Sequence, residues 1–172
     1  MTRLPRGPRS AAIGVAAVAL IAAGAGMWFL SARDEAPVGP IDAGDARLVA
    51  LGLEVYRQNC ASCHGAKLEG QPDWRTRKAD GKLPAPPHDE TGHTWHHADD
   101  QLFRLTKNGV KPPLAPDGYR SDMPAFDGVL TDEEIRAALA YIKSSWPDRA
   151  RARQQRIDDA VRRQSNLTGD GK

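Results

Sequence analysis

The sequence has few cysteines, few aromatic residues and no large excess of one charge. Two cysteines among 172 residues exclude a disulfide-rich scaffold. Aromatic side chains make up 6% of the chain, and the formal net charge is +2. A nucleic-acid-binding domain normally carries a dense basic stripe, whereas residues 33–146 hold 14 basic and 18 acidic side chains. These features exclude nucleic acid as an expected partner.

Apolar side chains are also scarce after the N-terminal region. Only 49 of the 140 residues from position 33 onward are aliphatic, aromatic, methionine or cysteine. Burial of apolar surface is the main favourable term in folding, and a small domain with so little of it needs another source. We therefore expect something other than its own side chains to fill part of the core.

A long uncharged run is present near the N-terminus, at residues 11–30. As an α-helix, a run of this length spans about 30 Å, the thickness of the hydrocarbon core of a bilayer. Three arginines precede the run and two acidic residues follow it, so the positive-inside rule places residues 1–10 in the cytoplasm. We expect residues 11–31 to be a single-pass anchor in the bacterial inner membrane and residues 32–44 to be a flexible linker to a periplasmic domain.

The same run also has features of a cleaved signal peptide. Eleven of its twenty residues are Ala or Gly, and Ala23, Gly24 and Ala25 form a small-residue cleavage site. Cleavage there would leave an apolar end, residues 27–30, exposed to water, which favours the anchor. Cleavage would instead give a soluble periplasmic protein, and both interpretations export the rest of the chain.

Helical spacing of apolar residues predicts the main elements of the exported part. An amphipathic helix is expected over residues 45–59, directly before Cys60, and a shorter one over residues 99–108. Thr131 and Glu134 have the spacing of a capping box, which opens a helix that we expect to end at Pro147.

A further helix is predicted over residues 148–164, polar on nearly all sides, with Ile157 and Val161 as its only large apolar pair. No strand pattern of any length is present. The fold class is therefore all-α, with a domain over residues 45–146 and a basic C-terminal extension over residues 147–172. Long loops rich in Gly and Pro separate the helices, and such loops are unusual in a compact domain unless they wrap something.

Both exported cysteines lie in the motif Cys60-Ala61-Ser62-Cys63-His64. A C-x-x-C-H motif predicts covalent attachment of a c-type haem, with thioethers from Cys60 and Cys63 and with His64 as the proximal iron ligand. A thioredoxin-like pair would need a βαβ unit, and a structural zinc site would need two further ligands at similar spacing. A plain disulfide, formed after export, is the remaining alternative.

The second iron ligand decides whether such a haem carries electrons or binds small molecules. Met123 is the only methionine outside the N-terminal region, and it lies in a polar loop before Pro124. We therefore expect Met123 to be the distal iron ligand, although a methionine can also act simply as a core gap-filler. Pro72 is a weak candidate to orient the His64 ring. The rival distal ligands are four histidines: His88, His93, His96 and His97.

Residues 45–146 resemble a single-haem class I cytochrome c. The resemblance rests on Gly52 and Tyr56 before the haem motif, on Ser121-Asp122-Met123-Pro124, and on Leu139-Ala140-Tyr141-Ile142 in the last domain helix. It implies an all-helical, cytochrome c-like fold around one covalent haem, with the first and last helices crossing at the glycine against Tyr56 and Tyr141. It also implies His64 and Met123 as axial ligands, and single-electron transfer.

Two features depart from that pattern. The cluster His93, His96 and His97, with His88 nearby, can be a haem-edge group that bonds a propionate or caps the next helix near Asp99, or alternatively a copper or zinc site. The basic extension carries six arginines against three aspartates over residues 148–164. We expect a solvated helix there, with docking to an acidic partner or to lipid headgroups as the alternatives.

The sequence therefore predicts a membrane-tethered periplasmic electron-transfer protein rather than an enzyme. Its expected partners are redox proteins: a respiratory complex, a terminal oxidase or a periplasmic dehydrogenase. The alternatives are a haem subunit within a larger oxidoreductase complex, and a haem and copper sensor or metal-handling module that uses His93, His96 and His97.

Overall fold

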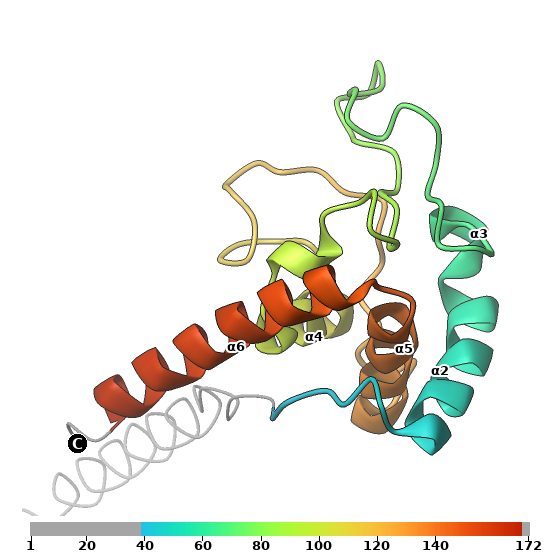
Figure 1. Ribbon diagram of the computed structural model, residues 1–172. Helices are drawn as coiled ribbons and strands as arrows, with labels where there is room; N and C mark the ends of the chain where they lie inside the picture. Colours follow the sequence, from blue (N-terminus) through green and yellow to red (C-terminus); the bar gives the residue numbers. More distant parts are fainter. Residues whose placement is uncertain (1–38, 170–172) are drawn as a thin grey trace, which may run out of the picture. The chain divides into compact units, whose positions relative to one another are not determined.

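The computed structural model describes residues 39–169 (Figure 1). This part of the chain is helical and contains no strand. Its elements are α2 (Ala46–Asn59), α3 (Ala61–His64), the 3-10 helix η1 (Thr94–His96), α4 (Asp99–Asn108), α5 (Asp132–Ser144) and α6 (Asp148–Gly169). The all-α expectation is confirmed for these residues.

The expected membrane anchor, residues 11–31, lies outside the described residues. Within residues 39–169, no helix combines the length and the apolar character that a bilayer span needs.

Helix α2 begins where the sequence predicts. The side chain of Asp45 accepts hydrogen bonds from the backbone N–H groups of Arg47 and Leu48, which satisfies two donors of the first turn. The helix buries Gly52, Val55 and Tyr56, and it ends at Cys60, which bonds back to the carbonyl of Tyr56.

Helices α2 and α5 cross in contact at Gly52. A Cβ atom at this position would lie 1.9 Å from the carbonyl oxygen of Ala137, so only glycine allows this approach. The rings of Tyr56 and Tyr141 pack beside the crossing with centroids 5.3 Å apart. The glycine crossing and its two tyrosines match what the family resemblance implied.

Helix α5 opens with the capping box that the sequence predicts. The hydroxyl of Thr131 accepts from the N–H of Glu134, and the Glu134 carboxylate accepts from the N–H of Thr131. The helix ends at Ser144, three residues before Pro147, and the next large side chain, Trp146, is fully buried.

Helix α4 begins in a way that the sequence does not reveal. Its N-cap residue is Ala98, which has no side-chain acceptor. The expectation that residues near His97 cap this helix is wrong: the N–H of Asp99 donates to the carboxylate of Asp158 in α6, at 2.6 Å. The cap is therefore tertiary, formed across 59 residues of sequence.

Helix α6 buries a polar face. Ala150, Gln154 and Asp158 are buried, whereas Val161 is 39% exposed. The expected helix is therefore present and mostly exposed, and it packs on the domain through these three residues rather than through Val161. The buried carboxylate of Asp99 explains why α6 packs through polar residues, because groups from α5, α6 and the segment before α2 are hydrogen-bonded to it.

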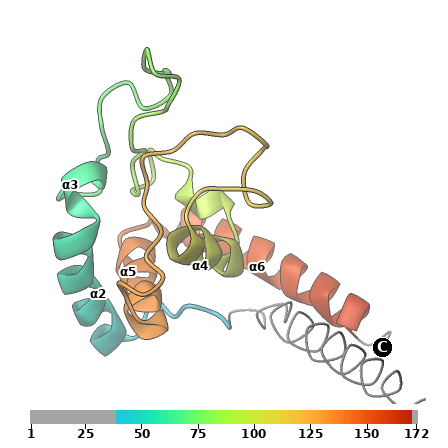
Figure 2. The same cartoon turned by 180° about the vertical axis from the view of Figure 1, so that it is seen from behind.

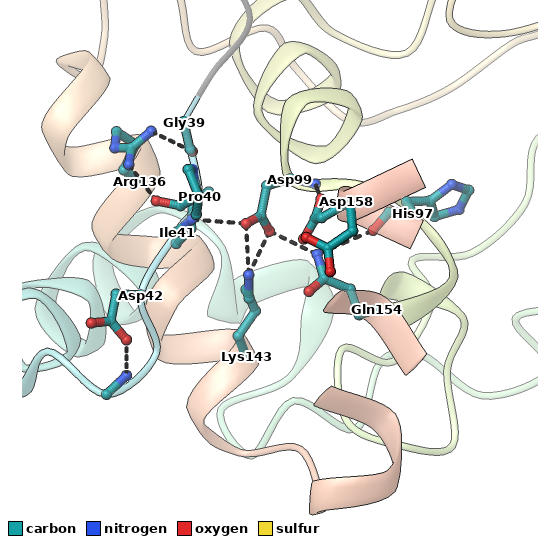
Figure 3. Close-up of polar contacts among 12 residues, drawn as sticks. Gly39, Pro40, Ile41, Asp42, His97, Asp99, Arg136, Lys143, Gln154 and Asp158 are labelled. Carbon is teal, nitrogen blue, oxygen red and sulfur yellow. Dashed lines mark hydrogen bonds and ion pairs between the residues drawn. The ribbon is translucent and has the colours of Figure 1, made fainter. Parts of the chain in front are cut away.

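Asp99 is 2% exposed and carries that network, which Figure 3 shows. Its oxygens accept from the Lys143 ammonium at 2.6 and 2.7 Å, from the Gln154 amide at 2.8 Å, and from the backbone N–H of Ile41 at 2.8 Å. A buried charge is tolerated only when it is paired and fully hydrogen-bonded, which is the case here. The network joins α4, α5, α6 and the segment before α2.

Two irregular loops complete the fold, one between α3 and η1 and the other between α4 and α5. Both extend beyond the same end of the helices, on the side where α3 lies (Figures 1 and 2). The first loop folds back tightly on itself, since Cβ atoms at Gly70 and Gly92 would lie 2.4 Å and 2.0 Å from the backbone at Pro87. Glycine is therefore required at both positions.

Candidate functional site

The C-x-x-C-H motif lies on α3, the single turn that follows α2. Cys60 is half-buried, Cys63 is exposed, and neither forms a disulfide. His64 is buried, and Gly65 ends the turn with φ of +83°. The Tyr56 hydroxyl donates to the carbonyl of Gly65 at 2.9 Å, which fixes this turn against α2.

The His64 ring has a defined orientation. Its Nδ1 lies 2.8 Å from the carbonyl oxygen of Pro86, and since a carbonyl can only accept, Nδ1 carries the proton. Pro86, rather than Pro72, is therefore the residue that orients this ring. Burial lowers the pKa of His64, so the imidazole is neutral at pH 7 with its Nε2 lone pair available to a metal.

His88 supports the same ring from one side. The two imidazoles are stacked with centroids 4.0 Å apart, and His88 Nδ1 is hydrogen-bonded to the Thr94 hydroxyl at 2.8 Å. Stacking on a ring face leaves the in-plane Nε2 of His64 free. The buried Trp146 indole donates to the carbonyl of His88 at 2.7 Å, so the turn between α5 and α6 holds this segment in place. Sequence reasoning missed Pro86 and this use of Trp146, because neither contact has a local pattern.

Met123 lies in the loop between α4 and α5. It is half-buried, and its N–H donates to the Ser121 hydroxyl at 3.0 Å. Met123 and Cys60 pack against the same hydrophobic core cluster although they are 63 positions apart. Lys82, from the other long loop, is hydrogen-bonded to Asp122 and lowers the pKa of that carboxyl, so the two loops are joined beside Met123.

The histidines of the cluster contact aromatic rings and one another. His93 stacks on Trp74 with centroids 5.4 Å apart and meets His97 edge-on, while His96 packs on Trp95. Across residues 39–169, no three His, Cys, Asp or Glu side chains are grouped so as to hold a metal ion. The Trp95 indole donates to the carbonyl of Glu90 at 3.3 Å.

These residues suit a covalently attached haem. Two unpaired thiols lie one turn apart directly before an imidazole whose Nε2 is free, which is the donor set that c-type haem attachment requires. Burial raises the pKa of the Cys60 thiol to about 11, so this thiol is protonated at neutral pH. The redox-pair and zinc alternatives lack their surroundings, because residues 39–169 contain no βαβ unit and no group of three His, Cys, Asp or Glu side chains that could hold a metal ion.

The all-helical fold, the α2–α5 glycine crossing and the haem motif define a class I c-type cytochrome, a haem-binding electron-transport protein whose cofactor is covalent haem c. Residues 47–142 match the family model described as "Cytochrome C oxidase, cbb3-type, subunit III", and the chain belongs to that family. The match ends before α6 begins.

Relatives of two kinds are similar to the chain. The cbb3-type cytochrome c oxidase subunit FixP of Sinorhizobium medicae is 27% identical over 96 residues, which is 56% of this chain and 29% of that protein. Cytochrome c6 of Tetradesmus obliquus is 30% identical over 95 residues, which is 55% of this chain and 86% of that protein. The chain thus spans under a third of the FixP relatives that it matches. No solved structure matches it.

Proposed function

We propose that this chain is a membrane-tethered periplasmic cytochrome that carries single electrons, with its haem held by thioethers from Cys60 and Cys63. His64 is the proximal iron ligand, through Nε2, and Met123 is the distal ligand. The haem, when bound, supplies a one-electron couple between ferrous and ferric iron. Ligation by His and Met raises the reduction potential of such a couple.

The orientation of His64 carries this proposal. The Pro86 carbonyl accepts a hydrogen bond from Nδ1–H, so Nε2 holds the available lone pair of the ring. A hydrogen bond to the other ring nitrogen is what fixes tautomer and direction in metal-binding histidines. His88 and Tyr56 hold the same turn, so the imidazole would keep its position when the iron changes charge.

The loop around Met123 performs the second role, which is to close the site. Met123 lies half-buried against the core, held by Ser121 and by the Lys82–Asp122 contact between the loops. A thioether presented from such a loop excludes water and small ligands from the distal face. With His64 and Met123 both holding the haem, the site would serve electron transfer and would leave no position for a substrate.

For the partner, we favour a terminal oxidase. This rests on the family, whose model describes subunit III of cbb3-type oxidases, and on the similar FixP proteins, which are subunits of such oxidases. A respiratory complex or a periplasmic dehydrogenase would be the electron donor. The chain would work either as a mobile tethered carrier or as a haem subunit of the oxidase complex.

The test is the optical spectrum of the oxidised, haem-loaded full chain. Sulfur-to-iron ligation gives a weak long-wavelength charge-transfer band, which we expect to be present in the parent and in Met27→Ala and to vanish in Met123→Ala. Retention of the band in Met123→Ala, or its absence from the parent, would show that Met123 is not the ligand. Co-purification with oxidase subunits under mild detergent separates the bound subunit from the free carrier.

A further inference from the structure

Helix α6 has a face of exposed arginines, of which Arg153 also lies over the Trp95 ring, 5.4 Å from its centroid. Arg149, Arg153, Arg156 and Arg163 are exposed and lie within about 80° of one another around the helix axis, over roughly 21 Å of its length. We call these four residues the arginine face. Because the family match covers residues 47–142, this face lies outside the part of the chain that the family describes.

The four guanidinium groups of this face have no carboxylate partner in the part of the chain that the structure describes. The other two arginines of the helix, Arg151 and Arg162, pair with Asp148 and Asp159. Uncompensated arginines on one side of a rigid helix attract an anionic surface.

Apolar groups accompany the arginines. Ile157, Ala160 and Val161 line a shallow groove beside Arg153 and Arg156. Leu167, further along the helix, is 81% exposed. This combination of guanidinium groups with a few apolar side chains is typical of a helix that lies at a membrane surface. The apolar area is small, so contact would depend on charge and on a second attachment to the bilayer.

The proposed membrane anchor supplies that second attachment, and the linker after it limits the distance of α6 from the membrane. Ile41 and Gln154 donate to the same carboxylate, that of Asp99, and Arg136 donates to the carbonyls of Gly39 and Pro40 (Figure 3). The linker therefore joins the domain beside α6. Eight residues separate position 30 from Gly39, and they reach at most about 28 Å. With residues 11–30 in the membrane, α6 stays within reach of its surface.

We propose that the arginine face of α6 binds the anionic headgroups of the membrane that carries the tether. This inference rests on the proposed membrane tether. Its consequence is an orientation: the domain would lie with α6 against the bilayer, rather than tumble freely on a flexible linker. The lipid recognised is an anionic phospholipid, for which phosphatidylglycerol serves as the probe.

The test is arginine footprinting of the haem-loaded full chain in nanodiscs. Phenylglyoxal labels exposed guanidinium groups, and mass spectrometry gives the labelling rate at each arginine. We expect the labelling rates at the arginine face to be roughly fivefold lower in phosphatidylglycerol discs than in phosphatidylcholine discs. This factor corresponds to the attraction of about 1 kcal/mol between one arginine and an anionic membrane surface. Arg47, Arg57 and Arg120, exposed on other elements, are internal controls and should label equally in both.

A paired variant tests the charge directly. In Arg156→Gln/Arg163→Gln, the protection of Arg149 and Arg153 should be lost, whereas Arg47→Gln/Arg57→Gln removes the same charge and should keep it. Equal labelling in both kinds of disc overturns the proposal. If protection appears only when the purified oxidase is added, the face binds an acidic protein surface, and the lipid proposal is again wrong.

Failure of the tether is visible separately. Haem absorbance that elutes with the discs shows that the chain is anchored. If the haem absorbance elutes apart from the discs, the holoprotein is instead sedimented with phosphatidylglycerol vesicles. Binding that Arg156→Gln/Arg163→Gln removes then supports the lipid contact without the tether, and no binding refutes it.

Discussion

The carboxylate of Asp158 accepts a hydrogen bond from the backbone N–H of Asp99, the first residue of α4, at 2.6 Å. Helix α4 begins after Ala98, which offers no acceptor of its own. Asp158 of α6 therefore acts as the N-cap acceptor of α4 in the haem domain. The extension is for this reason part of the folded unit, even though it lies outside the family match.

The first prediction concerns that cap. Asp158→Ala removes the side-chain acceptor of the Asp99 N–H and should lower the free energy of unfolding by about 1–2 kcal/mol. Asp158→Asn keeps an acceptor oxygen at the same place and should be close to the parent. Urea titration of the haem-loaded proteins at neutral pH measures both. Equal losses in the two variants would show that the charge, not the cap, matters.

The pH dependence of Asp158 is a separate prediction. Burial raises the pKa of this carboxyl above its ordinary value of 3.8. For a raised pKa, the stability is fully present below the unfolded pKa and is lost as the pH rises through the folded pKa. Relative to the parent, Asp158→Asn should therefore gain stability as the pH rises above about 4. A difference that stays constant with pH would contradict the shift.

A third prediction addresses the buried ion pair. In Lys143→Met, Asp99 keeps the N–H of Ile41 and the Gln154 amide but loses its cation. Removing one partner of a buried pair is strongly destabilising, and we expect a loss of about 3–5 kcal/mol in the free energy of unfolding. Urea titration of the haem-loaded variant and parent measures this loss.

The control for that variant is an exposed pair. Arg47 and Glu133 form a salt bridge with side chains 83% and 61% exposed, and such pairs contribute little. Arg47→Met should leave the denaturation midpoint nearly unchanged. If Arg47→Met and Lys143→Met had similar effects, burial would not be the cause.

The elements predicted correctly from sequence are those with local signals. Asp45 caps α2 within three residues, and Thr131 and Glu134 cap α5 in the same way. The Gly52 crossing could be expected because the family resemblance supplied it. Local hydrogen bonds of this kind leave a readable spacing in the sequence.

What sequence reasoning missed depends on distant contacts. The carbonyl of Pro86 reaches His64 across 22 residues, and Asp158 reaches Asp99 across 59. A backbone carbonyl has no sequence signature, and a buried polar face resembles a solvated one in a helical pattern. Ligation of iron by Met123 stays a prediction, which the packing of Met123 and Cys60 against the same core cluster supports.

A fourth prediction tests the support of the haem-binding turn. Tyr56 is fully buried and donates to the carbonyl of Gly65, which also accepts from the N–H of Leu68 at 3.2 Å. Tyr56→Phe removes one hydrogen bond and leaves the acceptor partly satisfied, so we expect a loss of about 1 kcal/mol in the free energy of unfolding. Tyr119→Phe, at a half-buried tyrosine of the other loop, is the matched control and should have no such effect.

The last prediction concerns the contact between α2 and α5. Alanine is favoured over glycine inside a helix by about 1 kcal/mol, so propensity alone would make Gly52→Ala stabilising. The new Cβ would, however, lie 1.9 Å from the carbonyl oxygen of Ala137, and this backbone atom cannot move without separating the two helices. We expect the clash to prevail, with a net loss of at least about 2 kcal/mol in the free energy of unfolding and a lower yield of haem-loaded protein.

Gly39→Ala is the control, because its Cβ would meet no atom within 4 Å. Urea titration of both variants decides the matter: a Gly52→Ala protein as stable as Gly39→Ala would mean that the helices do not cross in contact at this residue.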